Sequence, residues 1–197
     1  SKMDCIDSIK KYIDKNLSEK RRNHTYGVRD TALKLADKYG CDKEKAEKAA
    51  LLHDIFRGVS PDVLNYHVRH LGLDSRYVND ANLAHGPVAA QVIQRDFGIK
   101  DQDIINAVRY HTTGRDGMSL LEKIIYIADA IEPGRTYPGV DDIRKLAATD
   151  IDAACLASIN KTIDYVTSQG KYLDGETIEA KKFFEREIKQ KERADDK

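Results

Sequence analysis

Apolar residues recur at intervals of three and four positions along nearly the whole chain, which places them on one face of an α helix. Met3, Ile6, Ile9, Ile13 and Leu17 form the first such series. We find no stretch that alternates apolar and polar residues in the manner of a half-buried strand. The pattern therefore predicts an all-α fold, with helices over residues 3–17, 24–39, 43–57, 61–71, 88–97, 102–111, 120–131, 151–169 and 183–188, and a short helix from residue 141.

Residues that favour helix ends mark several of these boundaries. Ser119 and Glu122 have the spacing of a capping box before the most apolar helix. The run from Leu83 to Pro87 is interpreted as a turn into the fifth helix, which places His85 just ahead of it. An imidazole at that point would face a helix N-terminus, and helix N-termini attract anions such as phosphate.

The length of 197 residues suits one domain with a single core. We expect a single-domain helical bundle over residues 1–197, with its core at about 20–185, an N-terminal helix beside it, and a charged tail at 189–197 that frays. The 33 basic and 33 acidic residues balance, which argues against nucleic acid or an anionic membrane as partner. Small molecules are the expected partners, and the composition leaves oligomer formation open.

The cysteines and the absence of targeting features indicate a reducing compartment. Cys5, Cys41 and Cys155 are far apart and form no C-x-x-C pair, which argues against a disulfide framework and against a thiolate zinc site. No apolar run approaches the roughly 18 residues that span a bilayer, and the first residues lack the features of a signal peptide. The expected location is the cytoplasm.

A histidine and an aspartate stand side by side in the apolar run from Ala49 to Arg57. An ionised carboxylate is costly to bury unless a positive charge meets it, so a cation beside Asp54 would make this burial tolerable. Adjacent helix positions differ by about 100°, yet both side chains can reach an ion at the edge of the apolar face. His53 and Asp54 can therefore form half of a metal site. The alternative is that Asp54 faces solvent and His53 is an ordinary hydrogen-bonded core histidine.

Other metal-binding residue types lie on or beside different buried stripes. His24 precedes Gly27, whose cost of about 1 kcal/mol inside a helix is usually compensated by close approach of a neighbouring backbone or ligand. His111 ends the sixth helix on its inward side, and Asp129 shares the inward face of the most apolar helix. With His85, these residues make a set without thiolate that suits iron, manganese, zinc or magnesium, as one or two divalent ions.

Polar residues near these ligands suggest contacts to phosphate. Thr112 and Arg115 follow the sixth helix in a loop that contains glycine, and Arg135 follows the most apolar helix. Arg57 lies close to the His-Asp pair, and Tyr172 is a candidate for stacking on a nucleobase. The alternative for the arginines is a solvated surface charge, and for the tyrosine an ordinary core or surface position.

Four of these residues resemble the H…HD…D signature of the HD superfamily of metal-dependent phosphohydrolases, in the order His24, His53, Asp54 and Asp129. Residues 107–115 (AVRYHTTGR) and 120–135 resemble the bacterial YqeK branch of that superfamily, and the resemblance covers about residues 20–185. It implies an all-α HD domain. It also implies a symmetrical bis(5'-nucleosyl)-tetraphosphatase, which hydrolyses diadenosine tetraphosphate to two ADP.

The resemblance also implies roles for individual residues. The four signature residues are metal ligands, iron is the metal, and His85 and His111 either complete a second metal position or bind phosphate. Asp54, His85 and His111 are the implied catalytic residues. Arg57 stands where many HD proteins carry lysine; it keeps the charge but loses the option of donating a proton. The expected substrate contacts are His24, His85, His111, Thr112, Arg115, Arg135, Arg57 and Tyr172.

The expected reaction is attack of a metal-bound water on a phosphorus of the bridging polyphosphate, while arginines neutralise the charge that accumulates there. Two alternatives stay open. One is an HD-type phosphohydrolase of another nucleotide, such as a nucleoside monophosphate or a guanine alarmone. The other is a metal-stabilised module that binds a nucleotide without cleaving it.

Overall fold

The structure, a computed structural model, describes residues 2–196, with side chains from Cys5 onward, so the expected inward position of Met3 lies outside the described side chains. All regular elements of residues 2–196 are helical, and the all-α prediction is confirmed. The elements in chain order are α1 (Lys2–Asn16), α2 (Glu19–Tyr39), α3 (Lys43–Leu52), α4 (Pro61–His70), the short 3-10 helix η1 (Ser75–Tyr77), α5 (Ala81–Asp96), α6 (Gln102–Arg109), α7 (Leu120–Ile131), α8 (Val140–Ala147), α9 (Ile151–Ser168) and α10 (Gly175–Asp195).

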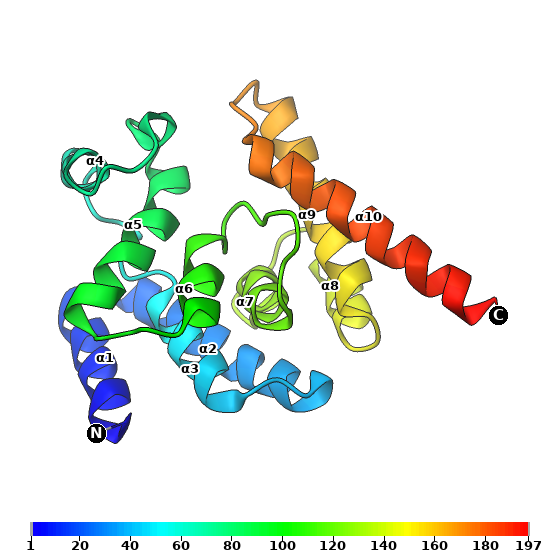
Figure 1. The fold of residues 1–197 in the computed structure, drawn as a ribbon, viewed down its shortest axis with the longest axis horizontal. Coiled ribbons are helices and arrows are strands. Elements are labelled where there is room, and N and C mark those ends of the chain that lie inside the picture. The colour runs from blue at the N-terminus through cyan, green and yellow to red at the C-terminus, as the bar shows by residue number, and fades with distance from the viewer. Residues whose placement is uncertain (1, 197) are drawn as a thin grey trace.

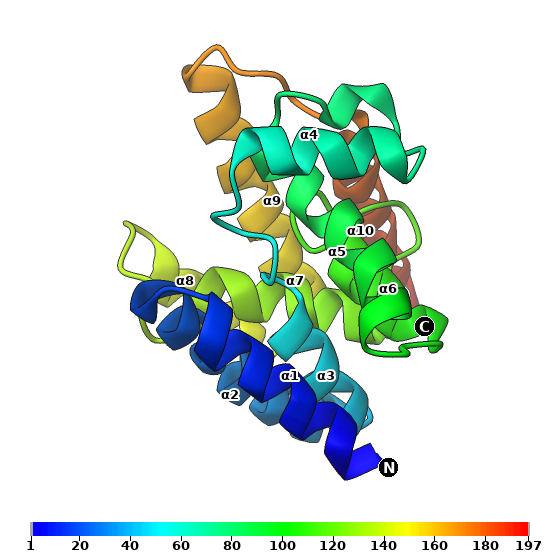
Figure 2. The same cartoon turned by 90° about the vertical axis from the view of Figure 1, so that its left-hand side faces the viewer.

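Helix α7 forms the centre of the molecule. It packs against α2, α3, α6, α8 and α9, and the capping box predicted for Ser119 and Glu122 is present at its start. In Figure 1, α7 is seen nearly end-on, with α4 to α6 on one side and α8 to α10 on the other. Figure 2 shows α1 to α3 at one end of the molecule and α4 at the opposite end. A polar side chain on α7 can therefore meet residues from several helices at once.

Helix α3 ends earlier than predicted. It stops at Leu52 rather than near Gly58, so His53 and Asp54 lie in the turns that follow. The apolar run does not reveal this end, because every residue from 51 to 56 is buried whether it is helical or not. His53 itself keeps helical backbone angles, φ −60° and ψ −34°, so the helix ends at this residue.

The expectation that the charged C-terminal segment frays is also wrong within the described residues. Helix α10 continues through this segment to Asp195. Lysine, glutamate, arginine and alanine are strong helix formers, so a solvated helix is compatible with this composition.

Helix α5 corrects the prediction for His85. It begins at Ala81, and the side chain of Asp80 accepts a hydrogen bond from the backbone N–H of Leu83, so Pro87 lies inside the helix. A Cβ at Gly86 would lie 2.9 Å from the carbonyl oxygen of Arg109. The glycine thus permits close approach of the end of α6 and does not mark a turn. His85 is buried within a helix, and the expected position beside a helix N-terminus is wrong.

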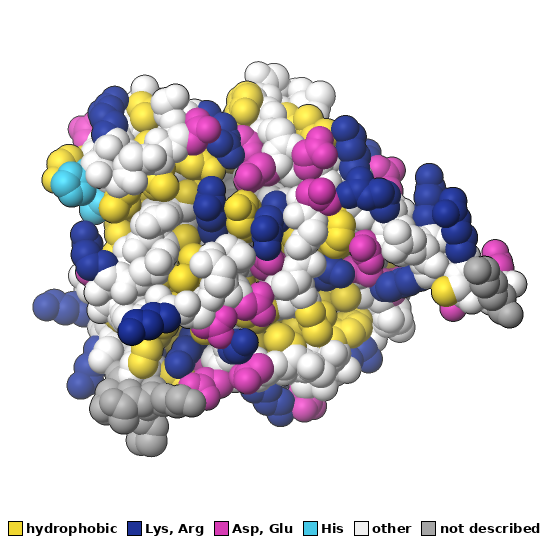
Figure 3. All heavy atoms as spheres, in the orientation of Figure 1, with side chains coloured by type: hydrophobic (Ala, Val, Ile, Leu, Met, Phe, Trp, Pro, Cys, Tyr) yellow, Lys and Arg dark blue, Asp and Glu magenta, His cyan; other side chains and the backbone are white. Residues whose placement is uncertain are grey.

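The surface carries charges of both signs. On the face shown in Figure 3, basic and acidic side chains are interspersed, in keeping with the equal numbers of the two kinds in the sequence. Among the helices of residues 2–196, none combines the length and apolarity needed to cross a membrane.

Candidate metal centre

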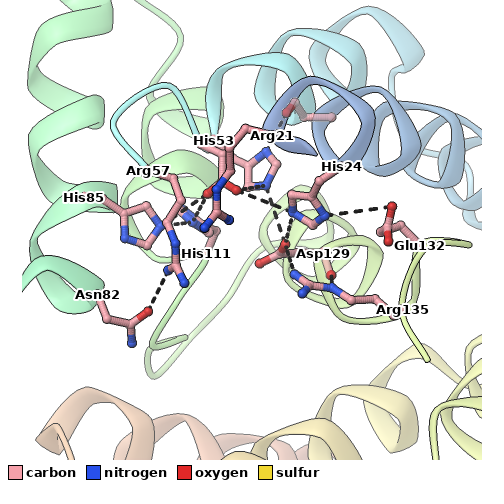
Figure 4. A network of polar contacts seen from close by, with 12 residues as sticks. Arg21, His24, His53, Arg57, Asn82, His85, His111, Asp129, Glu132 and Arg135 are labelled. Atoms are coloured by element: carbon pink, nitrogen blue, oxygen red, sulfur yellow. Dashed lines mark hydrogen bonds and ion pairs between the residues drawn. The ribbon is translucent and has the colours of Figure 1, made fainter. Parts of the chain in front are cut away.

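Four side chains that are far apart in sequence meet beside α7. His24 comes from α2, His53 and Asp54 from the turns after α3, and Asp129 from α7 itself. Figure 4 shows His24, His53 and Asp129 pointing toward one another. One ligand atom from each residue lies within 4.8 Å of the others. His24 Nε2 is 2.8 Å from Asp129 Oδ1 and 3.4 Å from Asp54 Oδ2. The geometry therefore brings the four predicted ligands together.

His53 presents an unpaired nitrogen to this cluster. The side chain is fully buried, and its Nδ1 donates a hydrogen bond to the carbonyl oxygen of Ala50 at 2.6 Å. Since the carbonyl can only accept, Nδ1 carries a proton and Nε2 faces the cluster. Nε2 is buried without a hydrogen-bond partner, 3.6 Å from Asp54 Oδ2 and 3.5 Å from Asp129 Oδ1. Buried polar atoms are normally paired, and a cation would satisfy this one.

Asp54 also belongs to a second cluster, with His85 and His111. Its Oδ1 lies 3.3 Å from His85 Nε2 and 3.4 Å from His111 Nε2, while its Oδ2 faces the first cluster. The Nδ1 atoms of His85 and His111 donate to the carbonyl oxygens of Ala81 and Val108. Their Nε2 atoms therefore face each other, at 2.9 Å. Two lone pairs at this distance need a positive centre near them, so this cluster also fits a metal ion.

The carboxylates set the charge of the site. Burial raises the pKa of Asp54, but the charge of His53 and the neighbouring imidazoles of His111 and His85 outweigh burial and hold this pKa well below its usual value. Burial also raises the pKa of Asp129, but His24 and His53 outweigh burial and hold this pKa well below its usual range. For His53, burial lowers the pKa, but Asp54 and Asp129 raise it to about 9. The two carboxylates stay ionised and favour positive charge between them, which a metal ion supplies as a proton does.

A buried glutamate that the sequence analysis did not select lies behind His24. Glu132 is 4% exposed, and its Oε2 is 3.8 Å from His24 Nδ1. A Cβ at Gly27 would lie 2.4 Å from Oε2 of this carboxylate, and one at Gly134 would lie 2.6 Å from Oε1. The cost of Gly27 inside α2 was a signal of close approach, and the neighbour is this side chain rather than a backbone or ligand.

Arginines stand around a pocket of about 250 Å³ that opens over the metal ligands. Arg135 donates from Nε to the carbonyl oxygen of Asp129 at 3.0 Å and from Nη2 to its Oδ1 at 3.2 Å. Arg57 donates from Nη1 to Asn82 Oδ1 at 2.8 Å. Arg21, which the sequence analysis also did not select, lines the same pocket (Figure 4). Positive side chains thus reach the pocket from several elements, as a phosphate site requires.

The structure separates the remaining predicted substrate contacts. Thr112 lines both the metal pocket and a neighbouring pocket of about 590 Å³, and Tyr172 lines the neighbouring pocket with its side chain largely exposed. Arg115 instead pairs with the buried carboxylate of Glu122 through two hydrogen bonds of 2.7 and 2.8 Å. Its guanidinium is engaged in the fold and is not among the residues lining the metal pocket.

The fold and this pair of clusters define a helical metal-binding domain, and comparison with known proteins names the family. A family model described as the HD domain matches residues 21–134. The chain therefore belongs to the HD-domain family, as predicted from His24, His53, Asp54 and Asp129.

Close relatives lie among the symmetrical tetraphosphatases. The chain is 41% identical over 160 residues to the symmetrical bis(5'-nucleosyl)-tetraphosphatase of Bacillus subtilis, covering 81% of this chain and 86% of the relative. Its identity to the protein of the same name from Staphylococcus aureus is 41% over 159 residues, covering 80% of this chain and 79% of the relative. The predicted resemblance is thus confirmed, whereas the roles of individual residues stay predictions.

A solved structure has the same fold. The predicted HD superfamily hydrolase involved in NAD metabolism from Clostridium acetobutylicum superimposes with a TM-score of 0.88 at 42% identity. The match covers 92% of this chain and 97% of the other.

Proposed function

We propose that this protein hydrolyses dinucleoside tetraphosphates symmetrically, with diadenosine tetraphosphate as substrate and two ADP as products. The observation that carries the proposal is the position of Asp54, whose two carboxylate oxygens face two different ligand clusters at the base of a pocket surrounded by arginines. Identity of 41% over most of the chain to two symmetrical tetraphosphatases supports the choice of substrate.

The donor set fits a divalent metal, and iron is part of the proposal. The cluster residues offer imidazole nitrogen and carboxylate oxygen without thiolate, a combination compatible with iron, manganese or zinc. When bound, such an ion lowers the pKa of a coordinated water and neutralises phosphate charge. The metal ligands would be His24, His53, Asp54 and Asp129, with His85 and His111 completing a second position beside Asp54.

The side chains around the pocket supply the remaining chemistry. Arg135 and Arg57 approach it from two sides and would bind the oxygens of the polyphosphate, each through a planar group with several N–H donors. Fixed positive groups stabilise the charge that develops on the transferred phosphoryl group and on its leaving phosphate. Thr112 and Tyr172 line the adjoining pocket, where they would contact the first nucleoside of the substrate.

We also propose that the protein is located in the cytoplasm. All three cysteines are free thiols, which suits a reducing compartment such as the cytoplasm.

Asp54→Ala provides the direct test. The variant should lose both bound metal, measured by anaerobic metal analysis, and release of ADP from diadenosine tetraphosphate, while circular dichroism shows unchanged helical content. Retained turnover would overturn the assigned site. Tyr66→Leu, a change at an exposed tyrosine on α4, is the matched control and should keep metal and activity.

A substrate panel separates this proposal from its alternatives. The wild-type holoenzyme, assayed anaerobically with iron and with manganese, should release ADP from diadenosine tetraphosphate faster than it hydrolyses AMP or guanosine tetraphosphate. A preference for either of those nucleotides would reassign the substrate. Tight binding of diadenosine tetraphosphate without turnover under both metals would make the protein a binding module.

A further inference from the structure

A second large pocket adjoins the metal pocket on the side of Arg135. It has a volume of about 600 Å³ and shares Arg135, Ala130, Ser158 and Thr162 with the metal pocket. The pocket of Tyr172 adjoins the metal pocket at Arg57. Arg57 and Arg135 both line the metal pocket, and Figure 4 shows Arg57 beside Asn82 and Arg135 beside Asp129. The metal pocket therefore has one flanking pocket beside Arg57 and another of similar size beside Arg135, and both flanking pockets reach Thr162 and Tyr165.

The lining of this second pocket suits a flat, largely apolar group. Tyr137 is half-buried, and its hydroxyl donates to the carbonyl oxygen of Ala130 at 2.6 Å, which fixes its ring against the end of α7. Lys161 Nζ lies 5.8 Å from the centre of that ring. Tyr165 is 59% exposed and lines both flanking pockets. Tyrosine rings are platforms on which nucleobases stack, with little dependence on the identity of the base.

We propose that the pocket of Tyr137, Lys161 and Tyr165 binds the second nucleoside of a dinucleoside polyphosphate, while the pocket of Tyr172 binds the first. This inference rests on the proposed function. It accounts for the arrangement of the site, because an arginine stands where each flanking pocket meets the metal pocket and can hold one half of the phosphate chain. Asp54 and Asp129 line the metal pocket together with the two arginines, so the bond that breaks would be near the middle of the chain.

Tyr137→Leu tests the inference with two ligands. The KM for diadenosine tetraphosphate should rise about tenfold with kcat little changed, because loss of base stacking on an aromatic ring corresponds to about 1–3 kcal/mol per base. Inorganic tetraphosphate carries the phosphates without a nucleoside, so its inhibition constant should stay within about twofold of that of the wild type. The Tyr172→Leu variant should also raise KM about tenfold, because it removes base stacking in the pocket of Tyr172.

The controls separate failure of the inference from failure of a variant to fold and from failure of the proposed function. Tyr66→Leu should change neither constant, since Tyr66 is exposed on α4 and lines neither pocket. An unchanged KM in Tyr137→Leu, or an inhibition constant that rises in parallel with KM, would overturn the inference. If Tyr137→Leu fails to fold, Lys161→Ala serves in its place with the same criteria, because Lys161 is exposed and lines this pocket but not the pocket of Tyr172. Absence of hydrolysis by the wild type would instead overturn the proposed function.

Discussion

A Cβ at Gly27 would lie 2.4 Å from Oε2 of Glu132, so the α2 backbone and this carboxylate occupy adjoining space that leaves no room for a side chain between them. Gly134 confines the carboxylate in the same way through Oε1. The confined group faces His24 Nδ1 at 3.8 Å. Histidines that bind metals usually direct their second ring nitrogen to a carboxylate or carbonyl, which fixes the ring. We therefore interpret Glu132 as the group that orients His24.

Gly27→Ala should weaken metal binding by about tenfold or more, because the new methyl group displaces the carboxylate that orients His24. Calorimetric titration of the metal-free protein with Mn²⁺ measures this effect without dependence on turnover. Helix propensity alone predicts that Gly27→Ala increases the stability of the protein, by about 1 kcal/mol.

The same change in a Glu132→Ala background is the matched control for Gly27→Ala. With the carboxylate gone, the methyl group has space, and Gly27→Ala should stabilise the metal-free protein by up to about 1 kcal/mol. Equal loss of metal affinity in both backgrounds would contradict the role assigned to Glu132.

Divalent metal should stabilise the fold, because it binds the assembled cluster and not the unfolded chain. At a free concentration about 100 times the dissociation constant, the expected gain is about 2.7 kcal/mol, or roughly 5–10 °C in Tm. Thermal unfolding of the protein with and without Mn²⁺, under anaerobic conditions, measures the gain. Asp129→Asn should reduce it, because Asp129 belongs to the first cluster alone, whereas His67→Ala on α4, outside both clusters, should retain it in full. An equal gain in Asp129→Asn would place the stabilising ion elsewhere.

Two arginines near the site should behave differently when replaced by alanine. Arg135→Ala should lower kcat/KM for diadenosine tetraphosphate by about 10²-fold or more, because its guanidinium contacts Asp129 and faces the pocket. Arg115→Ala should cost about 1.5–3 kcal/mol of stability, because it removes the two hydrogen bonds that Arg115 donates to the buried carboxylate of Glu122. It should leave kcat/KM of the folded protein little changed. Parallel kinetics and urea unfolding of the two variants test the contrast. The reverse ranking would return Arg115 to the substrate site.

A buried carboxylate far from the metal centre predicts a dependence of stability on pH. Asp152, 2% exposed at the start of α9, lies 2.8 Å from Lys123 Nζ and also pairs with Lys191. Burial raises its pKa, but the two lysines outweigh burial and lower it. The stabilisation is therefore complete above the pKa of an unfolded aspartate, about 3.9, and is lost as the pH falls through the lower pKa of the folded state.

Asp152→Asn should accordingly destabilise the protein by about 1.5–3 kcal/mol at pH 7, and the difference should shrink as the pH falls below about 4. Urea unfolding at pH 7, 5 and 3.5 measures it. Asp142→Asn, at an exposed position on α8, is the control and should change stability by less than about 0.5 kcal/mol at every pH. A constant difference for Asp152→Asn across the range would show that the effect is not electrostatic.

The sequence predicted the components of the metal centre better than their local backbone. His24, His111 and Asp129 were selectable because a polar residue on a buried helical face needs a partner, and that physical requirement does not depend on how the helices pack. The turn at His53 and the helix at His85 were not predictable in the same way. Both depend on tertiary contacts, such as the approach of the Arg109 carbonyl to Gly86, that leave no periodic signal.

The sequence also did not reveal which side chains pair with one another. Arg115 had the surroundings of a phosphate ligand in sequence, but its partner proved to be Glu122, seven positions later, across the loop that precedes α7. The sequence did not indicate Glu132 as a site residue, because Glu132 belongs to a run that ends a helix, where an acidic residue is usually solvated. Its burial depends on two glycines, of which one lies more than a hundred positions away in sequence.

The arrangement of the ligands constrains when a cation can enter during synthesis. The first imidazole leaves the ribosome early, yet the carboxylate of Asp129 is residue 129 of 197 and comes from the helix against which the others are assembled. A nascent chain that ends before α7 therefore carries the residues of the second cluster, Asp54, His85 and His111, but not the complete first cluster. The first cluster can therefore form only after α7 has been synthesised and has packed against α2 and α3.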